Sequence, residues 1–277
     1  MKKLFVFAKR SEKKEAEKII SEFLKFDCVL YTDVDDIKGT VFVTEPESII
    51  PDIECLVVLG GDGSLLGVAR EYAVFDKPIL GINFGRLGYL VELEKNDTDA
   101  LKKLFDNEFS IEERTMINAS VYRQGNAVFN GTALNDAVIT KGALSRMIHL
   151  KLEVSGLLAN QYHADGVVIA TPTGSTAYSM SAGGSVVTPE LEAFLITPIC
   201  PHSVTSKPIV VSDKQKIKIE ADFVAEEEVY LTLDGQEVLR LQKGDYVEIK
   251  KSDCVTKLIR IKERNFFSIL KQKLENR

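Results

Sequence analysis

The chain has 277 residues, of which 45% are hydrophobic and 27% are charged. This length suits one large domain or two ordinary ones, and the composition is that of a folded globular protein. The net charge of −6 argues against nucleic acid as the main partner, because nucleic-acid-binding domains usually present a basic face. No apolar stretch approaches the roughly 20 residues that span a bilayer, and the first residues do not resemble a signal peptide. We therefore expect a cytoplasmic protein without a membrane partner.

The spacing of cysteine and histidine predicts neither a disulfide framework nor a metal site. The scattered residues are Cys28, Cys55, Cys200 and Cys254, with His149, His163 and His202. No two cysteines form a C-x-x-C pair, which favours reduced and unpaired thiols. The sequence therefore leaves the ligands of any metal unknown.

In the first 112 residues, apolar runs alternate with helical patterns. Runs typical of buried strands occupy residues 3–8, 28–31, 40–43, 53–59 and 77–85. Apolar side chains recur at helical spacing from Ala16 to Leu24, and residues 64–72 and 96–109 also predict helices. Alternation of this kind predicts a parallel sheet covered on both faces, so we assign residues 1–112 to an α/β domain.

From residue 113 onward, apolar residues recur at alternate positions. The segments with this period are 147–154, 215–221, 228–234, 236–242, 245–251 and 256–261. A period of two, with turn residues between the segments, predicts antiparallel strands with one wet face. We assign residues 113–262 to a mostly-β domain, and residues 263–277 have the spacing of a final helix.

Residues 59–64, LGGDGS, form a glycine-rich turn between a predicted strand and a predicted helix. Gly60, Gly61 and Gly63 can take positive φ and admit a ligand close to the backbone, and N–H groups at the helix start would face an anion. The turn is not a Walker loop, because no Gly-Lys-Ser/Thr follows. It is not a Rossmann fingerprint either, since Leu66 stands in place of the third glycine.

Asp62 lies at the centre of this turn. One interpretation is a tight strand-to-helix turn in which Asp62 caps the helix. The other is a phosphoryl-transfer site, where a carboxylate accepts the proton of the attacking alcohol and cations offset the charge of the phosphates. The turn alone leaves both interpretations open.

A more unusual stretch covers residues 164–184, ADGVVIATPTGSTAYSMSAGG. Asp165 precedes a predicted buried strand at 167–171, and a hydroxyl-rich turn at 173–176 leads toward Tyr178. Small hydroxyls before a helix can cap it, and they can equally bind a base or a sugar.

Two smaller features accompany these motifs. Residues 83–90, NFGRLGYL, follow a strand and include Gly85, Gly88 and Tyr89, which alone predict a loop. The pair Asn135–Asp136 has apolar neighbours on both sides. That pattern favours a strand whose polar pair faces a pocket, with a bulge as the alternative.

Seven motifs follow one another in the order GGDGS, GINFGRLGYL, LNDAVI, DGVVIATPTGSTAYSMSAGG, LITPICPHS, LDGQ and TKLIRIKERNFFSILKQKL. In this order the chain resembles the NAD kinases, also called ATP- or polyphosphate-NAD kinases, over nearly its whole length. The glycine turn alone also fits lipid kinases and phosphofructokinases, and TPTGSTAYS separates the NAD kinases from both.

The resemblance implies an NAD kinase. Such an enzyme uses Mg²⁺, or another divalent metal, and transfers the γ-phosphoryl group of ATP to the 2′-hydroxyl of the adenosine ribose of NAD, giving NADP. The resemblance also implies an α/β N-terminal domain, a β-sandwich-like C-terminal domain that binds NAD, and a last helix at 263–277 that joins the first domain. A homodimer or homotetramer is implied, with Asp165 meeting NAD across a subunit contact. Whether polyphosphate replaces ATP as donor is left open.

Residue roles follow from the same resemblance. Asp62 corresponds to the general base. The positions that correspond to substrate contacts are Gly61, Gly63, Tyr89, Asn135, Asp136, His163, Asp165, Thr173, Thr176, Ala177, Tyr178 and Ser181. His163 stands where the family more often has Arg, and Asp136 is one methylene shorter than the frequent Glu.

Two other functions stay open at this point. A lipid or sugar kinase with the same glycine turn would need a different acceptor pocket. A nucleotide-sensing module would bind NAD or NADP without turnover. The carboxylate of Asp62 counts against the sensor, because a pure phosphate binder gains nothing from a negative charge beside the phosphate.

Overall fold

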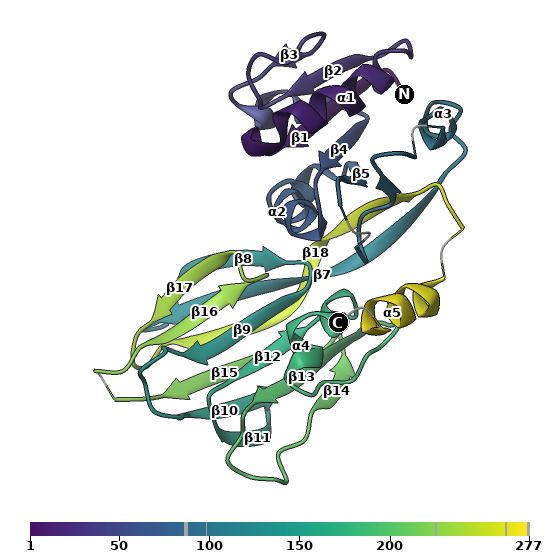
Figure 1. The fold of residues 1–277 in the computed structure, drawn as a ribbon. Helices are drawn as coiled ribbons and strands as arrows, with labels where there is room; N and C mark the ends of the chain where they lie inside the picture. Colours follow the sequence, from purple (N-terminus) through teal and green to yellow (C-terminus); the bar gives the residue numbers. More distant parts are fainter. Residues whose placement is uncertain (86–87, 98, 225, 264, 276–277) are drawn as a thin grey trace. The chain divides into compact units, whose positions relative to one another are not determined.

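The computed structural model describes residues 1–85, 88–97, 99–224, 226–263 and 265–275 (Figure 1). Arg86 and Leu87 of the NFGRLGYL motif lie outside the described residues. The chain forms two compact units: unit 1 comprises Met1–Glu113 and Thr256–Arg277, and unit 2 comprises Arg114–Val255. Domain limits at 112 and 262, which the sequence suggests, lie near these divisions and stay a prediction.

Unit 1 is built on a parallel sheet. Its strands are β1 (Lys3–Ala8), β2 (Val29–Thr32), β3 (Val41–Phe42), β4 (Cys55–Leu59), β5 (Pro78–Asn83), β6 (Leu93–Glu94) and the last residues of β18 (Tyr246–Arg260). The strand order is β18–β5–β4–β1–β2–β3, with β6 beside β5, and these pairings are parallel. The α/β domain expected from the sequence is confirmed.

Helices cover both faces of this sheet. They are α1 (Lys13–Phe23), α2 (Asp62–Tyr72) and α3 (Ala100–Phe105), and α5 (Phe266–Glu275) ends the chain. The apolar face predicted for α1 is confirmed, except that Leu24 follows the helix and is exposed. Side chains of α1 and α3 belong to one apolar cluster with the sheet. On α2, Tyr72 stacks on Phe7 of β1, with ring centroids 4.9 Å apart.

Strand β3 departs from the expectation. The run at 40–43 predicts a buried strand, but Val41 and Phe42 are 47% and 46% exposed. The reason is position, because β3 is the last strand in the order and has a neighbour on one side only.

Unit 2 contains two antiparallel sheets. One has six strands in the order β14–β13–β12–β9–β16–β17. Their bounds are β9 (Asp136–Lys141), β12 (Gly166–Ala170), β13 (Ala193–Ile199), β14 (Ile209–Ser212), β16 (Val229–Leu233) and β17 (Glu237–Leu241). The other sheet runs β11–β10–β15–β18, and β18 also pairs with β7, which pairs with β8. Its further bounds are β7 (Ser110–Arg123), β8 (Asn126–Ala133), β10 (Ile148–Val154), β11 (Leu157–Ala164) and β15 (Ile217–Asp222).

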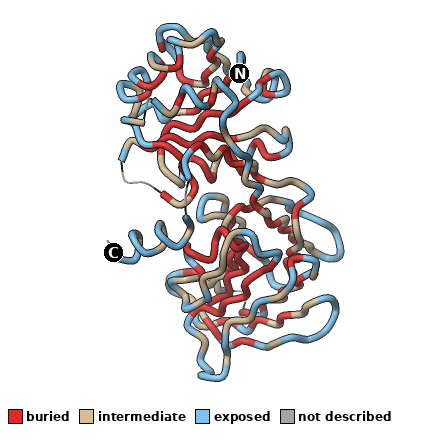
Figure 2. The backbone as a smooth tube through the Cα atoms, turned by 90° about the vertical axis from the view of Figure 1, so that its right-hand side faces the viewer, coloured by how far each residue is buried: buried red, intermediate tan, exposed pale blue. Residues whose placement is uncertain are grey.

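The inward faces of the two sheets form the core of unit 2. Ile148, Leu150 and Leu152 alternate along β10 as the period of two predicts, and they share one apolar cluster with Ile169 and Phe194 of the other sheet. Figure 2 shows buried backbone concentrated in the strands. The mostly-β, sandwich-like domain expected from the sequence is confirmed.

The part of the 164–184 motif that follows β12 packs over the outer face of the six-stranded sheet. A 3₁₀ turn, Thr173–Thr176, precedes the short helix α4 (Tyr178–Ser181). Beyond α4, Ala182 and Val187 pack against a small apolar cluster that includes Val168 of β12.

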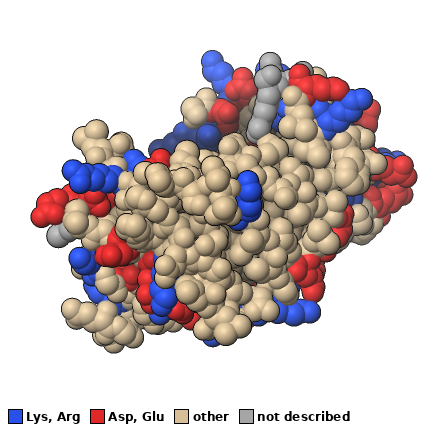
Figure 3. All heavy atoms as spheres, turned by 90° about the horizontal axis from the view of Figure 1, so that it is seen from below, with Lys and Arg blue, Asp and Glu red and all other residues tan. Residues whose placement is uncertain are grey.

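Thiols and charges are dispersed in the structure. The four cysteines form no disulfide, as the sequence predicts. On the face shown in Figure 3, uncharged residues fill most of the middle, and basic and acidic side chains lie near one another around the margin. No helix within the described residues is both long enough and apolar enough to cross a membrane.

The core of unit 2 can be tested with a pair of leucines on neighbouring strands. Leu150 is 1% exposed, and Leu157 is 75% exposed. We expect Leu150→Ala to lower the free energy of unfolding by about 3 kcal/mol, because it leaves a cavity between the sheets. Leu157→Ala should stay within about 0.5 kcal/mol of the parent. Urea unfolding of both variants measures the difference, and equal losses would contradict the sandwich core.

Candidate active site

The glycine turn of unit 1 joins β4 to α2. Gly60 has φ +155°, whereas Gly61 precedes the helix with φ −85° and Gly63 lies inside it. The expectation of positive φ is therefore wrong for Gly61 and Gly63, because the helix begins at Asp62 and imposes helical φ on the residues within it.

The Asp62 carboxylate binds a loop rather than its own helix. Oδ2 accepts a hydrogen bond from the backbone N–H of Tyr89 at 2.8 Å. Oδ1 accepts from Leu90 at 3.1 Å and from Val91 at 3.2 Å. The helix start has no side-chain capping bond, so the capping interpretation of Asp62 is wrong.

Gly88 allows the loop to approach this carboxylate. A Cβ on Gly88 would lie 2.0 Å from Asp62 Oδ1, which is far inside van der Waals contact. Only glycine at this position is therefore compatible with the observed hydrogen bonds of Asp62. The sequence predicts that Gly88 lies in a loop, but it does not predict that Gly88 contacts Asp62.

A buried ion pair holds the other end of the same loop. Arg260 Nη1 donates to the Leu90 carbonyl at 3.0 Å and to Glu92 Oε2 at 3.2 Å. Glu92 is 1% exposed, and its Oε1 accepts from the N–H groups of Ile261 and Lys262 at 2.9 and 2.7 Å. The loop that binds Asp62 is thereby fixed to the end of β18 within unit 1.

Unit 2 contains a cavity of about 300 Å³. It is lined by Asn135, Asp136, Val138, Thr140, Ala177, Tyr178, Thr232, Asp234 and Gly235. Four of the predicted substrate-binding residues therefore share one cavity, and Asp234 and Gly235 join them. A cavity of this size suits part of a small-molecule ligand.

The Asn135–Asp136 pair faces this cavity, but it does not lie within a strand. Leu134 and Asn135 form a bend after β8, and Asp136 is the first residue of β9. The chain bends there because the carboxylate of Asp234 takes three successive N–H groups. The donors are Leu134 at 2.9 Å, Asn135 at 2.7 Å and Asp136 at 3.1 Å.

Asp234 is a residue that the sequence analysis missed. It has φ +52° in the turn between β16 and β17, where its neighbour is Gly235. An Asp-Gly pair between two alternating segments predicts a tight turn. Nothing in the local pattern predicts a partner about 100 residues earlier in the chain.

Asp136 lies in an unusual electrostatic environment. Burial, together with the nearby charge of Asp234, raises the pKa of its carboxyl group to about 7, and burial is the larger cause. Asp136 is 5% exposed. A large part of the Asp136 population is therefore protonated near neutral pH.

Thr171, two residues before the hydroxyl-rich turn, supports the same bend. Thr171 Oγ1 donates to the Leu134 carbonyl at 2.6 Å and accepts from Gly174 N–H at 3.1 Å. Thr173 Oγ1 accepts from Arg114 Nη1 at 3.2 Å, and the Arg114 side chain is buried. The interpretation of these hydroxyls as caps is wrong for α4, whose N-terminal residue has no side-chain capping bond. Thr176 is buried beside Thr173, whose carbonyl its Oγ1 contacts at 3.4 Å.

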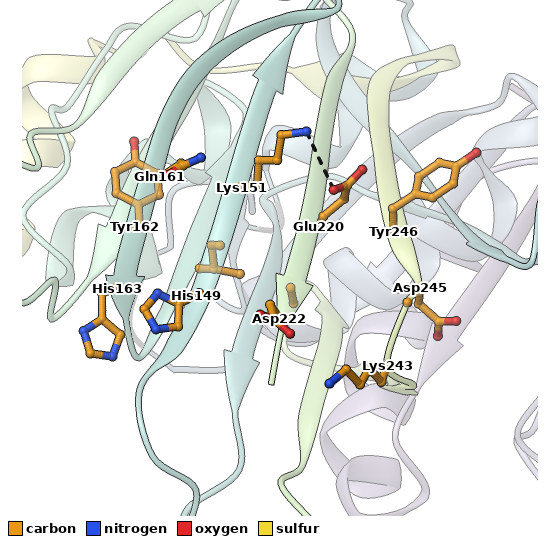
Figure 4. Close-up of a pocket in the computed structure, with 13 residues that line it drawn as sticks. His149, Lys151, Gln161, Tyr162, His163, Glu220, Asp222, Lys243, Asp245 and Tyr246 are labelled. Atoms are coloured by element: carbon orange, nitrogen blue, oxygen red, sulfur yellow. Dashed lines mark ion pairs between the residues drawn. The ribbon is translucent and has the colours of Figure 1, made fainter. Parts of the chain in front are cut away.

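Besides Thr173 and Thr176, three predicted site residues of unit 2 do not line this cavity. Ser181 is exposed at the end of α4. Asp165 lies 3.7 Å from the ammonium group of Lys141. His163 lines a separate cavity of about 740 Å³ on the outer face of β10, β11 and β15 (Figure 4).

His149 and His163 both line that second cavity. His149 and His163 stack with ring centroids 4.3 Å apart, and His202 lies 5.8 Å from His163. Cross-strand pairing of β10 with β11 brings the first two together. Within the described residues, no group of three or more His, Cys, Asp or Glu side chains is arranged to hold a metal ion.

Comparison with known families covers both units. A family model described as the ATP-NAD kinase N-terminal domain matches residues 8–109. A second, described as the ATP-NAD kinase C-terminal domain, matches residues 134–261. The chain belongs to the NAD kinase family. The resemblance inferred from the motifs is thereby confirmed, and the lipid and sugar kinases lose their support.

Curated relatives in this family match most of the chain. The NAD kinase of Caldanaerobacter subterraneus subsp. tengcongensis is 47% identical over 225 residues, which cover 80% of this chain and 78% of the relative. The NAD kinase of Ruminiclostridium cellulolyticum is 40% identical over 245 residues, covering 88% and 84%.

Solved structures of NAD kinases share the fold. A yeast NADH kinase complexed with NADH aligns with a TM-score of 0.87 at 23% identity, covering 99% of this chain and 88% of that one. An NAD kinase from Archaeoglobus fulgidus in complex with ATP aligns with a TM-score of 0.76 at 27% identity, covering 99% of both chains.

The contact between Asp62 and its loop can be tested at two glycines. Gly88→Ala places a methyl group against the Asp62 carboxylate, and we expect turnover of NAD to fall roughly 10²-fold because the carboxylate is displaced. Gly85→Ala is the matched control, since a Cβ there meets nothing within 4 Å. Steady-state kinetics measures both variants. Equal activity of the two would show that turnover does not require the close contact between Gly88 and the Asp62 carboxylate.

The raised pKa of Asp136 predicts a pH-dependent stability. An unfolded Asp ionizes near pH 4. The folded carboxyl ionizes near 7, so the free energy of unfolding contributed by Asp136 falls as pH rises between these values. Asp136→Asn should therefore raise the unfolding temperature more at pH 8 than at pH 5. Asp222→Asn, at an exposed carboxylate of the same unit, is the control. An equal shift of the Asp136→Asn variant at both pH values would contradict the prediction.

Proposed function

We propose that this chain transfers the γ-phosphoryl group of ATP to the 2′-hydroxyl of the adenosine ribose of NAD, giving NADP and ADP. The observation that carries this proposal is the Asp62 carboxylate, held at the start of α2 by three backbone N–H groups. Membership in the NAD kinase family supplies the substrate class.

Asp62 acts as the proton acceptor. A carboxylate has about four acceptor sites, and the three N–H bonds leave one of them on Oδ2. The three bonds also fix the direction of that remaining acceptor site, so orienting the base in the reacting complex costs less entropy. The sugar hydroxyl donates to it in the reacting complex.

The reaction balances without a covalent intermediate. The 2′-oxygen forms a bond to the γ-phosphorus while the bond from that phosphorus to the oxygen of ADP breaks. The hydroxyl proton passes to Asp62 and then to solvent. Backbone N–H groups of the Gly61–Gly63 turn, at the positive end of α2, face phosphate oxygens, and Tyr89 lies on the adjoining loop.

Mg²⁺ enters this scheme with ATP as part of the substrate. The described residues provide no cluster of three metal-binding side chains, which fits an ion held by phosphate oxygens and water. The ion offsets the charge that develops on the phosphates.

The unit 2 cavity binds NAD. Asn135 and Asp136 offer an amide and a carboxyl group to sugar hydroxyls, and Ala177 and Tyr178 offer an apolar surface to a ring. Thr173 and Thr176 lie in the 3₁₀ turn that directly precedes Ala177. The remaining predicted contacts, His163 and Ser181, stay predictions.

We also propose a homodimer or homotetramer, in which Asp165 reaches NAD bound to another subunit. The support is the resemblance to the family, together with the position of Asp165 outside the cavity of its own chain. The use of polyphosphate as donor and the cytoplasmic location stay predictions.

The direct test is an assay of purified protein with NAD and MgATP, in which NADP is detected by an NADP-specific dehydrogenase. We expect NADP to accumulate, and a parallel reaction with polyphosphate reports the range of donors. Absence of NADP from folded protein that binds NAD would favour the nucleotide-sensing alternative.

Removal of the proposed base should separate chemistry from binding. We expect Asp62→Asn to lower kcat by roughly 10²- to 10⁴-fold, the usual effect of a general base, with little change in the Kd for NAD. Because Asn also loses acceptors for the loop, the unfolding temperature must be measured beside kcat. Near-normal turnover would confine Asp62 to holding the loop.

A further inference from the structure

We propose that Asp234 is the positioning residue of the NAD pocket, which presents Asn135 and Asp136 to the dinucleotide. This inference rests on the proposed binding of NAD in the unit 2 cavity. Asp234 lies at that cavity, in the turn between β16 and β17.

A count of backbone groups shows how much depends on this residue. The segment Leu134–Asp136 has three N–H and three carbonyl groups, and no strand ladder serves Leu134 or Asn135. Asp234 takes all three N–H groups through its carboxylate and donates its own N–H to the Asp136 carbonyl at 3.0 Å. Thr171 satisfies the other two carbonyls, at 2.6 and 2.9 Å.

Without this carboxylate, three adjacent donors would lose their acceptor. Buried backbone groups almost always have partners, so the segment would rearrange or admit water. Either change moves the Asn135 and Asp136 side chains away from the geometry that lines the cavity. Asp234 therefore acts on the ligand through the segment that it holds.

The same carboxylate also sets the charge state of its neighbour. Burial and the negative charge of Asp234 both raise the pKa of Asp136, to about 7. The other ionizable group on the cavity wall is Tyr178. Lys141, at the end of β9, is paired with Asp165, and Arg114 contacts Thr173.

An ionized Asp136 has two acceptor oxygens, which match a pair of donating sugar hydroxyls. Protonation replaces an acceptor by a donor and weakens this recognition. Affinity for NAD should therefore fall as pH drops through about 7, and removing the charge of Asp234 should shift that fall to lower pH.

The test is the Kd for NAD, measured by calorimetry between pH 6 and pH 8.5 on the full chain. For the parent protein, we expect the Kd to rise roughly tenfold from pH 7.5 to pH 6. For Asp234→Asn, we expect a Kd raised about 10- to 100-fold at pH 8, the effect of a lost hydrogen bond to a charged group. In this variant, the pH at which affinity for NAD falls should be lower than in the parent protein. For Asp136→Asn, the Kd should be raised and independent of pH in this range.

Asp213→Asn is the matched control. Asp213 is a buried carboxylate of the same unit, 1% exposed, that pairs with the ammonium group of Lys251 at 2.6 Å and lines neither cavity described above. This variant should lose stability without changing the Kd for NAD or its pH dependence. The comparison separates a positioning role from a general loss of packing.

Two outcomes overturn the inference: an Asp234→Asn variant with the parental Kd and pH dependence, or an Asp213→Asn variant with the same loss of affinity. Neither outcome bears on phosphoryl transfer. Conversely, a parent protein that binds NAD and forms no NADP refutes the proposed function while leaving this binding experiment intact.

Discussion

Carboxylates that accept runs of backbone N–H groups hold the loops of this molecule. Asp62 binds three successive donors at 89–91, and Asp234 binds three at 134–136. Glu92 binds two more at 261–262. These loops lack a strand ladder, so a charged side chain supplies the acceptors that a neighbouring strand would otherwise provide. The proposed base and the proposed NAD pocket both depend on these carboxylate acceptors.

Different surroundings give three aspartates of this chain different chemistry. Asp62 and Asp234 face N–H dipoles, which stabilise a negative charge and fix its direction. Asp136 has a buried carboxyl group beside a second carboxylate, and its pKa rises for that reason. Three aspartates therefore divide into an oriented carboxylate that we propose as the proton acceptor, a carboxylate that holds a loop, and a group that titrates near neutral pH. Their positions relative to the main chain, and not their residue type, make this distinction.

Local patterns predicted much of this structure. The period of two on β10 and the apolar face of α1 follow from side-chain geometry alone, and the order of the motifs is sufficient to indicate the family. The contacts of Asp62 and Asp234 could not be predicted, because each partner is distant in sequence and is a main-chain group that every residue carries. The break at Asn135 was hidden for the same reason. Apolar neighbours indicated a strand, and the acceptor that bends it lies about 100 residues away.

The absence of tryptophan makes the fluorescence of tyrosine a usable signal for the site. The chain has no tryptophan and eight tyrosines. Tyr178, which is 46% exposed, lines the unit 2 cavity, and Tyr89 donates its N–H to Asp62. Ultraviolet emission of the unlabelled protein therefore comes from tyrosine alone, without a tryptophan to mask it by energy transfer. A nicotinamide or adenine ring lying against Tyr178 would quench part of that signal, so occupancy of the pocket is open to direct spectroscopic titration.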